Sequence, residues 1–154
     1  MCFTVNVKHM KSLPGWTIKI DEISNGVFKV TLKDTFGHTA EVIDAATDRT
    51  IEKAKSYAFD IEQQVSENWN LFLYNLCLLT LDGEDISENN YNNQVFGSWL
   101  VRSFDNRIVY DGRDSWLIYQ NGKTGEWADE VIIKRYDLTY NNFIEIVDRL
   151  ITRK

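Results

Sequence analysis

The stretch GWTIKIDEISNGVFKV, residues 15–30, decides how the fold begins because two alternating runs flank an Asn-Gly pair. From Trp16 to Ile20 the apolar and polar side chains alternate, and this is the period of a half-buried β-strand. Val27 to Leu32 alternates in the same way and predicts the return strand. Asn25 and Gly26 tolerate the positive φ values of a type I′ turn, so the stretch predicts an antiparallel hairpin.

A third strand and a long helix are predicted directly after this hairpin. Residues 35–38 (TFGH) indicate a second turn, and Ala40 to Ile43 is typical of a short strand. Either Thr47 or Asp48 is expected to cap the helix, since a side-chain oxygen there accepts from the first free amides. One apolar stripe then recurs at spacings of three and four: Ile51, Ala54, Ala58, Ile61 and Val65. Three meandering strands with one apolar face need such a helix to cover them.

The apolar segment from Leu71 to Leu81 stays open between helix and strand. No Gly or Pro interrupts residues 44–82, so the first helix can continue with a bend near Asn68. A buried strand is the other reading of the same pattern. We favour a break at residues 66–70, followed by an apolar strand or a short helix.

Four strands and a final helix are predicted in the rest of the chain. The strands span residues 96–104, 107–110, 115–120 and 126–136, with turns between them. Val131 to Ile133 is continuously apolar, and this favours the centre of the sheet. Thr139 is expected to cap the C-terminal helix. The buried face of that helix is expected to comprise Phe143, Ile146, Val147 and Leu150.

Length and charge bound the class of protein. The 154 residues fit a single domain over residues 1–154, with the α+β class: an antiparallel sheet with a long helix after the third strand and a C-terminal helix. The Asn-rich segment at residues 82–94 is the one boundary that the sequence suggests. A net charge of −6 argues against nucleic acid and against anionic membranes, because both need a basic surface. A basic protein partner is compatible with this charge.

The segment DGEDISENNYNNQ, residues 82–94, is the candidate partner-binding site. It holds four carboxylates and no Lys or Arg, and the next cation along the chain is Arg102. We expect an exposed loop that carries negative potential, because such a stretch cannot bury itself. The expected contact residues are Asp82, Glu84, Asp85 and Glu88, with Tyr91 as an aromatic anchor.

The sequence offers no catalytic pattern, so we expect a protein that is not an enzyme and has no catalytic residue, metal site or cofactor. His9 and His38 are expected to be ordinary surface residues without a partner that would make either one a base. Cys2 and Cys77 are widely spaced and give no metal-ligand pattern.

Two other functions use different residues. A metal-dependent hydrolase would use Asp82, Glu84 and Asp85 as its acidic groups. An RNA-binding protein would use Trp99, Trp116 and Tyr119 as stacking platforms, but the acidic balance argues against it.

The N-terminal residues lack the basic start and long apolar core of a signal peptide. The longest apolar runs, residues 71–74 and 76–79, are far too short to span a membrane. A bacterial-type, reducing cytoplasm is therefore the expected compartment.

Three pieces of the first half resemble a known class of protein. They are residues 15–30, residues 34–38 (DTFGH) and residues 54–62 (AKSYAFDIE). Together they are similar to bacterial immunity proteins, which are encoded beside polymorphic or contact-dependent toxins. The resemblance implies a cognate inhibitor that binds a toxin domain, often a basic nuclease, and blocks its active site. No individual functional residue carries over from it. A regulatory protein–protein interaction module without a toxin is the alternative.

Overall fold

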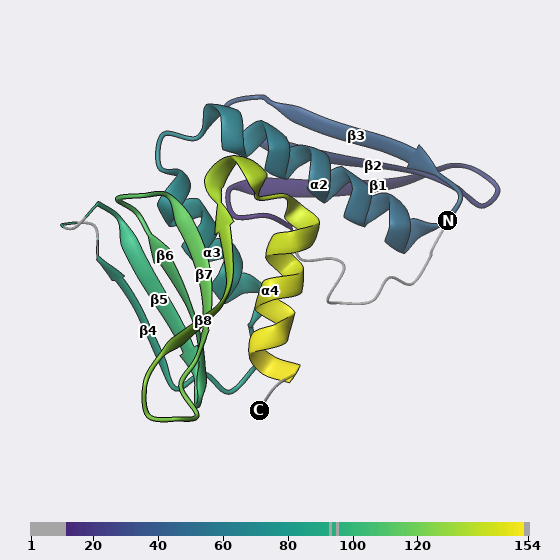
Figure 1. The fold of residues 1–154 in the computed structure, drawn as a ribbon. Helices are drawn as coiled ribbons and strands as arrows, with labels where there is room; N and C mark the ends of the chain where they lie inside the picture. The colour runs from purple at the N-terminus through teal and green to yellow at the C-terminus, as the bar shows by residue number, and fades with distance from the viewer. Residues whose placement is uncertain (1–11, 93, 95, 153–154) are drawn as a thin grey trace. The chain divides into compact units, whose positions relative to one another are not determined.

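The computed structural model describes residues 12–92, 94 and 96–152, and its elements form an α+β fold with antiparallel sheets (Figure 1). The predicted fold class is confirmed, including the long helix after the third strand and the C-terminal helix. The chain divides into two compact units, residues 1–66 and 67–154. The sequence had suggested a boundary in the acidic segment at residues 82–94, but the observed boundary lies earlier, between residues 66 and 67. Whether residues 1–154 behave as one domain stays a prediction.

The first unit pairs a three-stranded sheet with one helix. The strands β1 (Trp16–Ser24), β2 (Val27–Asp34) and β3 (Thr39–Asp44) form an antiparallel sheet in the order β1-β2-β3. Helix α2 (Thr47–Val65) contacts β2 and β3. Val30 and Leu32 of β2 and Ile51 of α2 are fully buried. This core follows from the alternation in β2 and the 3.6-residue period of α2.

The turn between β1 and β2 lies at the predicted residues but has a different geometry. Gly26 has a φ of 76°, whereas Asn25 does not have a positive φ. A type I′ turn needs positive φ at both central residues, so that part of the prediction is wrong. The pairing shifts register between Glu22 and Ser24. Such a bulge increases the local twist, so the strands meet without the turn type that the sequence suggested.

The start of α2 is held by Asp44 and not by Thr47 or Asp48, so the predicted caps are wrong. The N-cap residue is Ala46, which makes no side-chain capping bond. The Asp44 carboxylate instead accepts a hydrogen bond from the Ala45 amide at 2.6 Å. It also accepts from Arg49 at 2.6 Å and from Lys53 at 3.0 Å. These cations hold the pKa of Asp44 well below its ordinary value. The carboxylate that ends β3 therefore ties the first two turns of α2 to the sheet.

The buried face of α2 follows the predicted stripe only in its first turns. Ile51, Ala54 and Ala58 are fully buried, and so is Phe59, whereas Val65 is 44% exposed. Ile61 is half-buried. Val65 is the last residue of the helix. Lys55, which lies outside the apolar stripe, is only 5% exposed and forms an ion pair with Glu52 at 3.7 Å.

The open segment of the second unit is a helix. Helix α3 (Trp69–Thr80) begins after a break at residues 66–68, as predicted, and Asn68 caps it by accepting from the Leu71 amide at 3.1 Å. Leu73 and Cys77, four residues apart, are both fully buried. The i, i+4 spacing of these residues puts them on one helical face.

A five-stranded antiparallel meander forms the sheet of this unit. Its strands, in spatial order, are β4 (Glu88–Asn92), β5 (Ser98–Ser103), β6 (Asn106–Asp111), β7 (Trp116–Asn121) and β8 (Ala128–Lys134). Strand β4 was predicted as loop. Strand β8 is an edge strand, so the prediction that residues 131–133 lie at the sheet centre is wrong, and Ile132 is 49% exposed.

Helix α4 (Tyr140–Thr152) follows the short 3₁₀-helix η1 (Arg135–Asp137) and ends the described chain. Its predicted cap is confirmed. The Thr139 Oγ1 accepts from the Asn142 amide at 3.2 Å, and the Asn142 Oδ1 accepts from the Thr139 amide at 2.7 Å. This reciprocal pair satisfies two backbone donors at the helix start. The predicted buried face is confirmed: Phe143, Ile146, Val147 and Leu150 are all at most 4% exposed.

Candidate interaction surfaces

The acidic segment lies on the surface, but only its first half is a loop. Asp82, Glu84 and Asp85 are exposed in the turn that follows α3. Glu88 is exposed on the edge strand β4, where it pairs with Arg102 of β5. The Ser87 amide donates to the Arg102 carbonyl at 3.0 Å and starts this pairing. The segment therefore presents three carboxylates from a turn and one, Glu88, from a sheet edge that β5 holds in place.

Tyr91 does not point the same way as Glu88. The two residues are three apart on one strand, so their side chains leave opposite faces of the sheet. Tyr91 is half-buried, and its ring centroid lies 5.4 Å from that of Tyr74 on α3. Its hydroxyl donates to the Asn68 Oδ1 at 3.4 Å. The structure thus places the expected anchor against α3, apart from Glu88. Its role in partner binding stays a prediction.

The five-stranded sheet has one covered face and one open face. Helices α3 and α4 both contact β5 on the covered face, and α4 also contacts β6 (Figure 1). There Trp99 is 2% exposed, and Tyr110 and Tyr119 are fully buried. Trp116 is half-buried and lies on the open face, because residues of alternate parity point to opposite sides of a strand. Trp99, Trp116 and Tyr119 therefore do not form one stacking platform.

The open face carries a polar row that the sequence analysis missed. Strand pairing aligns five side chains across the whole sheet: Glu88, Arg102, Arg107, Gln120 and Asp129. Beside the row lies Trp127. The Arg107 Cζ is 4.0 Å from the centroid of its ring, and the Arg102 Cζ is 5.1 Å away. These are cation–π distances. The open face therefore holds two cations against an aromatic ring.

The pairing of the two arginines was missed because the sequence placed the turn at residues 105–106, which would pair Phe104 with Arg107. The structure has the turn at residues 104–105, so Arg102 and Arg107 are cross-strand partners. The contribution of Trp127 was not detectable, because it lies in the loop before β8 and its contact with the arginines depends on how that loop folds.

His38 lies in the turn between β2 and β3, as predicted, and has a carboxylate neighbour that the sequence analysis did not identify. Its Nδ1 lies 2.6 Å from the Asp34 Oδ2. The Asp34 Oδ1 accepts from the backbone amides of Phe36 at 2.9 Å and of His38 at 2.8 Å. Burial raises the pKa of Asp34, but the hydrogen bonds from His38 and Phe36 outweigh it and the net pKa is lowered. The carboxylate closes the turn between β2 and β3.

Replacing Asp34 by Ala is expected to lower the free energy of unfolding near neutral pH by about 2 kcal/mol, because two backbone amides lose their acceptor. The folded-state pKa of Asp34 lies below its unfolded value of roughly 3.9, so this stabilisation is present above that pH. It is lost as the pH falls through the folded-state pKa. Urea unfolding at a series of pH values measures both effects. Asp21→Asn is the matched control, since Asp21 forms only an exposed ion pair with Lys19.

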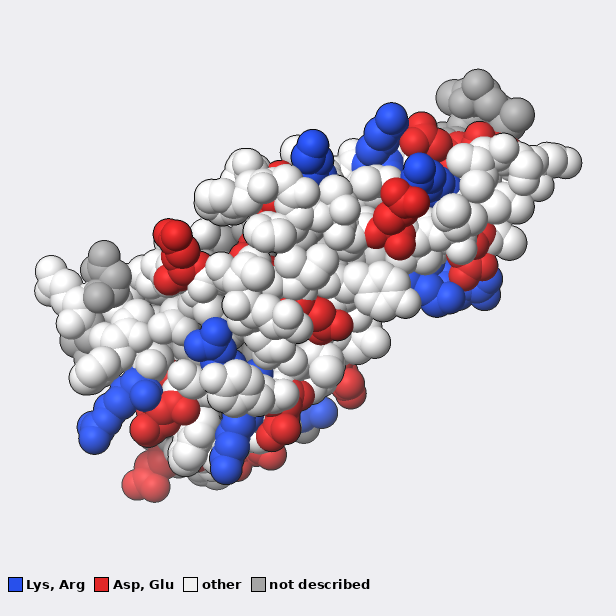
Figure 2. All heavy atoms as spheres, turned by 90° about the horizontal axis from the view of Figure 1, so that it is seen from above, with Lys and Arg blue, Asp and Glu red and all other residues white. Residues whose placement is uncertain are grey.

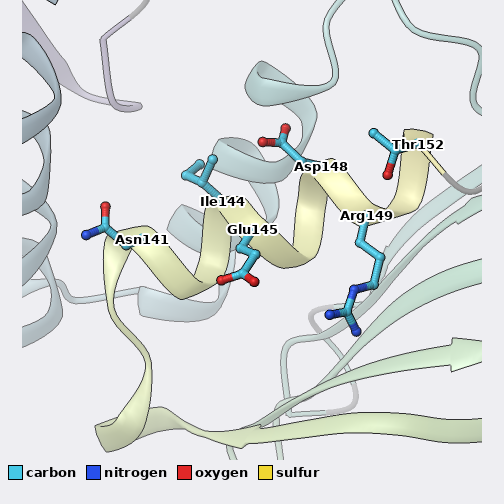
Figure 3. Close-up of a pocket in the computed structure, with 6 residues that line it drawn as sticks. All are labelled: Asn141, Ile144, Glu145, Asp148, Arg149 and Thr152. Atoms are coloured by element: carbon cyan, nitrogen blue, oxygen red, sulfur yellow. The ribbon is translucent and has the colours of Figure 1, made fainter. Parts of the chain in front are cut away.

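An open hollow along α4 has no enclosed site. Figure 3 shows its six lining residues, Asn141, Ile144, Glu145, Asp148, Arg149 and Thr152, all from this one helix. The Arg149 Cζ lies 5.6 Å from the centroid of the Tyr119 ring. A single helix face does not surround a small molecule, so the hollow lacks the concavity that ligand sites share.

Other chemical groups are placed as follows. Cys77 is fully buried, and burial raises the pKa of its thiol, so it is a poor thiolate nucleophile.

Within residues 12–92, 94 and 96–152, no group of three or more His, Cys, Asp or Glu is placed to hold a metal ion. The same part of the chain has no helix long and apolar enough to cross a membrane. On the face seen in Figure 2, Lys and Arg side chains are interspersed with Asp and Glu.

No family model, curated protein or solved structure matches the chain.

Proposed function

We propose that this protein is a cytoplasmic immunity protein that binds a cognate toxin domain with 1:1 stoichiometry and neutralises it. The toxin domain is expected to be basic, with a nuclease as the expected activity. The observation that carries the proposal is the exposed acidic segment, whose four carboxylates lie on the turn after α3 and on the edge strand β4. The resemblance of residues 15–30, 34–38 and 54–62 to immunity proteins supports the same function.

The position of the carboxylates defines what they would do in such a complex. All four are exposed, so they attract a basic partner before contact and raise the association rate. An ion pair that stays exposed in the complex contributes at most about 1 kcal/mol. A pair that becomes desolvated contributes more, and removing one partner of it then costs about 2–5 kcal/mol. The association rate is therefore the property that the acidic segment is expected to control most directly.

The test needs the cognate toxin domain. We expect a neighbouring gene to encode a large secreted protein whose variable C-terminal domain is that toxin. Co-expression of that domain with this chain is expected to restore growth of the producing cells. If no such gene exists, or if the chain fails to protect, the regulatory interaction module is the better description.

The acidic segment is tested by the variant Asp82→Asn, Glu84→Gln, Asp85→Asn, Glu88→Gln. Its association rate with the toxin domain at low salt is expected to fall about tenfold or more, and the difference should shrink as salt screens the charges. The matched control removes four other exposed carboxylates: Asp60→Asn, Asp105→Asn, Asp114→Asn, Glu126→Gln. Both variants change the net charge equally, so an equal loss in the two would show that net charge, and not this segment, sets the rate.

A further inference from the structure

The two arginines on the open face stand in an arrangement that costs stability. Arg102 and Arg107 are direct cross-strand partners, and like charges directly opposite each other repel. Burial of Arg107 and the charge of Arg102 lower the pKa of Arg107, and together they outweigh the charges of Glu88 and Asp129, which raise it. The pair is nevertheless held rigidly. The Arg102 Nε donates to the Phe104 carbonyl at 2.7 Å, and the Arg107 Nε donates to the Gln120 Oε1 at 2.6 Å.

The guanidinium groups of Arg102 and Arg107 are each hydrogen-bonded through Nε and lie against the Trp127 ring. Neither forms an ion pair within 4.0 Å with a carboxylate in the described part of the chain. Asp129 lies in the same row, but Gln120 donates to its Oδ1 at 2.6 Å. Each arginine uses its Nε for an internal bond, which leaves its two terminal nitrogens as the donors that a carboxylate could accept from.

An apolar row runs beside the arginines on the same face. Strand pairing aligns Leu100, Val109, Ile118 and Ile132 across four strands. Ile132 is 49% exposed, and the other three are half-buried. Trp and Arg are the residues most enriched at the energetic centres of protein interfaces, and here they adjoin an apolar strip. The composition fits a protein partner.

We propose that the open face of the five-stranded sheet binds a protein segment that seats a carboxylate between Arg102 and Arg107 and lays apolar side chains along the row from Leu100 to Ile132. A carboxylate between the two guanidinium groups would offset their repulsion. Glu88 and Asp129 close the two ends of the polar row, so it suits a single carboxylate better than the continuous charge of a nucleic acid. This proposal does not depend on the toxin proposal, because the ligand here is acidic, although Glu88 belongs to both surfaces.

The experiment uses the full chain and two short peptides as probes. The peptide acetyl-Leu-Asp-Leu-Asp-Leu-amide carries the expected chemistry, and the same peptide with Asn for Asp is its neutral match. Binding is followed by the side-chain Nε–Hε signals of the arginines in ¹⁵N NMR. We expect saturable shifts at Arg102 and Arg107 with the acidic peptide and none with the neutral peptide. Arg113, exposed in the turn after β6, reports non-specific attraction in the same spectra.

Variants then separate the contribution of the arginines to peptide binding from that of the apolar row. Arg107→Gln is expected to raise the dissociation constant of the acidic peptide at least tenfold, whereas Arg113→Gln leaves it unchanged. Ile132→Ser is expected to weaken binding several-fold, since it removes apolar contact. Urea unfolding of each variant shows whether its fold is intact.

Three outcomes would overturn the proposal: no saturable shift with the acidic peptide, equal shifts at Arg113, or tighter binding of inorganic phosphate or an oligothymidine than of the peptide. The last would assign the arginine pair to a phosphate ligand. Because no toxin enters this experiment, its failure leaves the immunity proposal untouched, and loss of toxin protection leaves this surface untouched.

Discussion

Replacing Phe143 by Ala is expected to lower the free energy of unfolding of the second unit by about 4 kcal/mol, the typical cost of deleting a buried aromatic ring. Phe143 is fully buried on α4, and its neighbours on that helix face, Ile146 and Val147, are also buried. The ring cannot be replaced by solvent without leaving a cavity among them. Urea unfolding followed by tryptophan fluorescence measures the change, since Trp69, Trp99, Trp116 and Trp127 all belong to this unit.

Ile144→Ala is the matched control, because Ile144 is half-buried on the same helix. This variant is expected to lose well under half of the free energy of unfolding that Phe143→Ala loses.

Hydrogen exchange in both variants also tests whether residues 1–154 form one domain. If they do, the amides of α2 lose protection together with those of α4. If each unit opens separately, α2 keeps its protection in the Phe143 variant. A loss equal to that of Ile144→Ala would show that Phe143 is not a core residue.

Helix α4 was predictable because several signals agree along it. Its cap and its apolar period both point to one helix, and the structure confirms the cap at Thr139 and the four buried residues. In α2 the period was clear but the cap was not. The residue that organises its start, Asp44, precedes the helix and acts through Arg49 and Lys53, one and two turns into the helix.

The edge position of β8 was not predictable, because the composition of a strand does not say whether a further strand pairs beyond it. The apolar run at residues 131–133 is typical of a central strand, yet in the described part of the chain β8 pairs only with β7 and lies at the edge. Strand β4 was missed for the opposite reason. Its sequence, ENNYN, has low intrinsic preference for a strand, and it is extended because it pairs with β5.

The candidate surfaces were predicted only in part for the same reason, because strand pairing decides which side chains share a face. Exposure of the acidic residues follows from their composition, so the sequence placed them correctly on the surface. Which face of β4 each residue occupies depends on register, and register separates Glu88 from Tyr91. The arginine pair depends on a turn at residues 104–105, one residue before the predicted one. Its aromatic partner Trp127 comes from a loop 20 residues after Arg107 whose path no periodic pattern encodes.

Replacing Gly112 by Ala is expected to cost about 3 kcal/mol, at the upper end of what overpacking usually costs. Gly112 opens the turn between β6 and β7, and a Cβ atom there would collide with the carbonyl oxygen of Phe96. The obstacle is backbone, so no side-chain rotation relieves it. The Gly112 amide also donates to the Ser98 Oγ at 2.9 Å, which fixes the turn against the start of β5. Urea unfolding measures the cost, and amide shifts at Ser98 and Gly112 locate the distortion.

Gly125→Ala separates this steric effect from the general cost of losing a glycine. Gly125 has a φ of 87°, and a Cβ atom added there would have nothing within 4 Å, so alanine meets only backbone strain, about 1 kcal/mol. A smaller loss at Gly112 than at Gly125 would mean that the turn after β6 moves away from Phe96 easily. In that case the Ser98 hydrogen bond should break, and its amide signal would shift although stability barely changes. A large loss at Gly112 with little shift at Ser98 would instead place the strain elsewhere in the turn at residues 112–115.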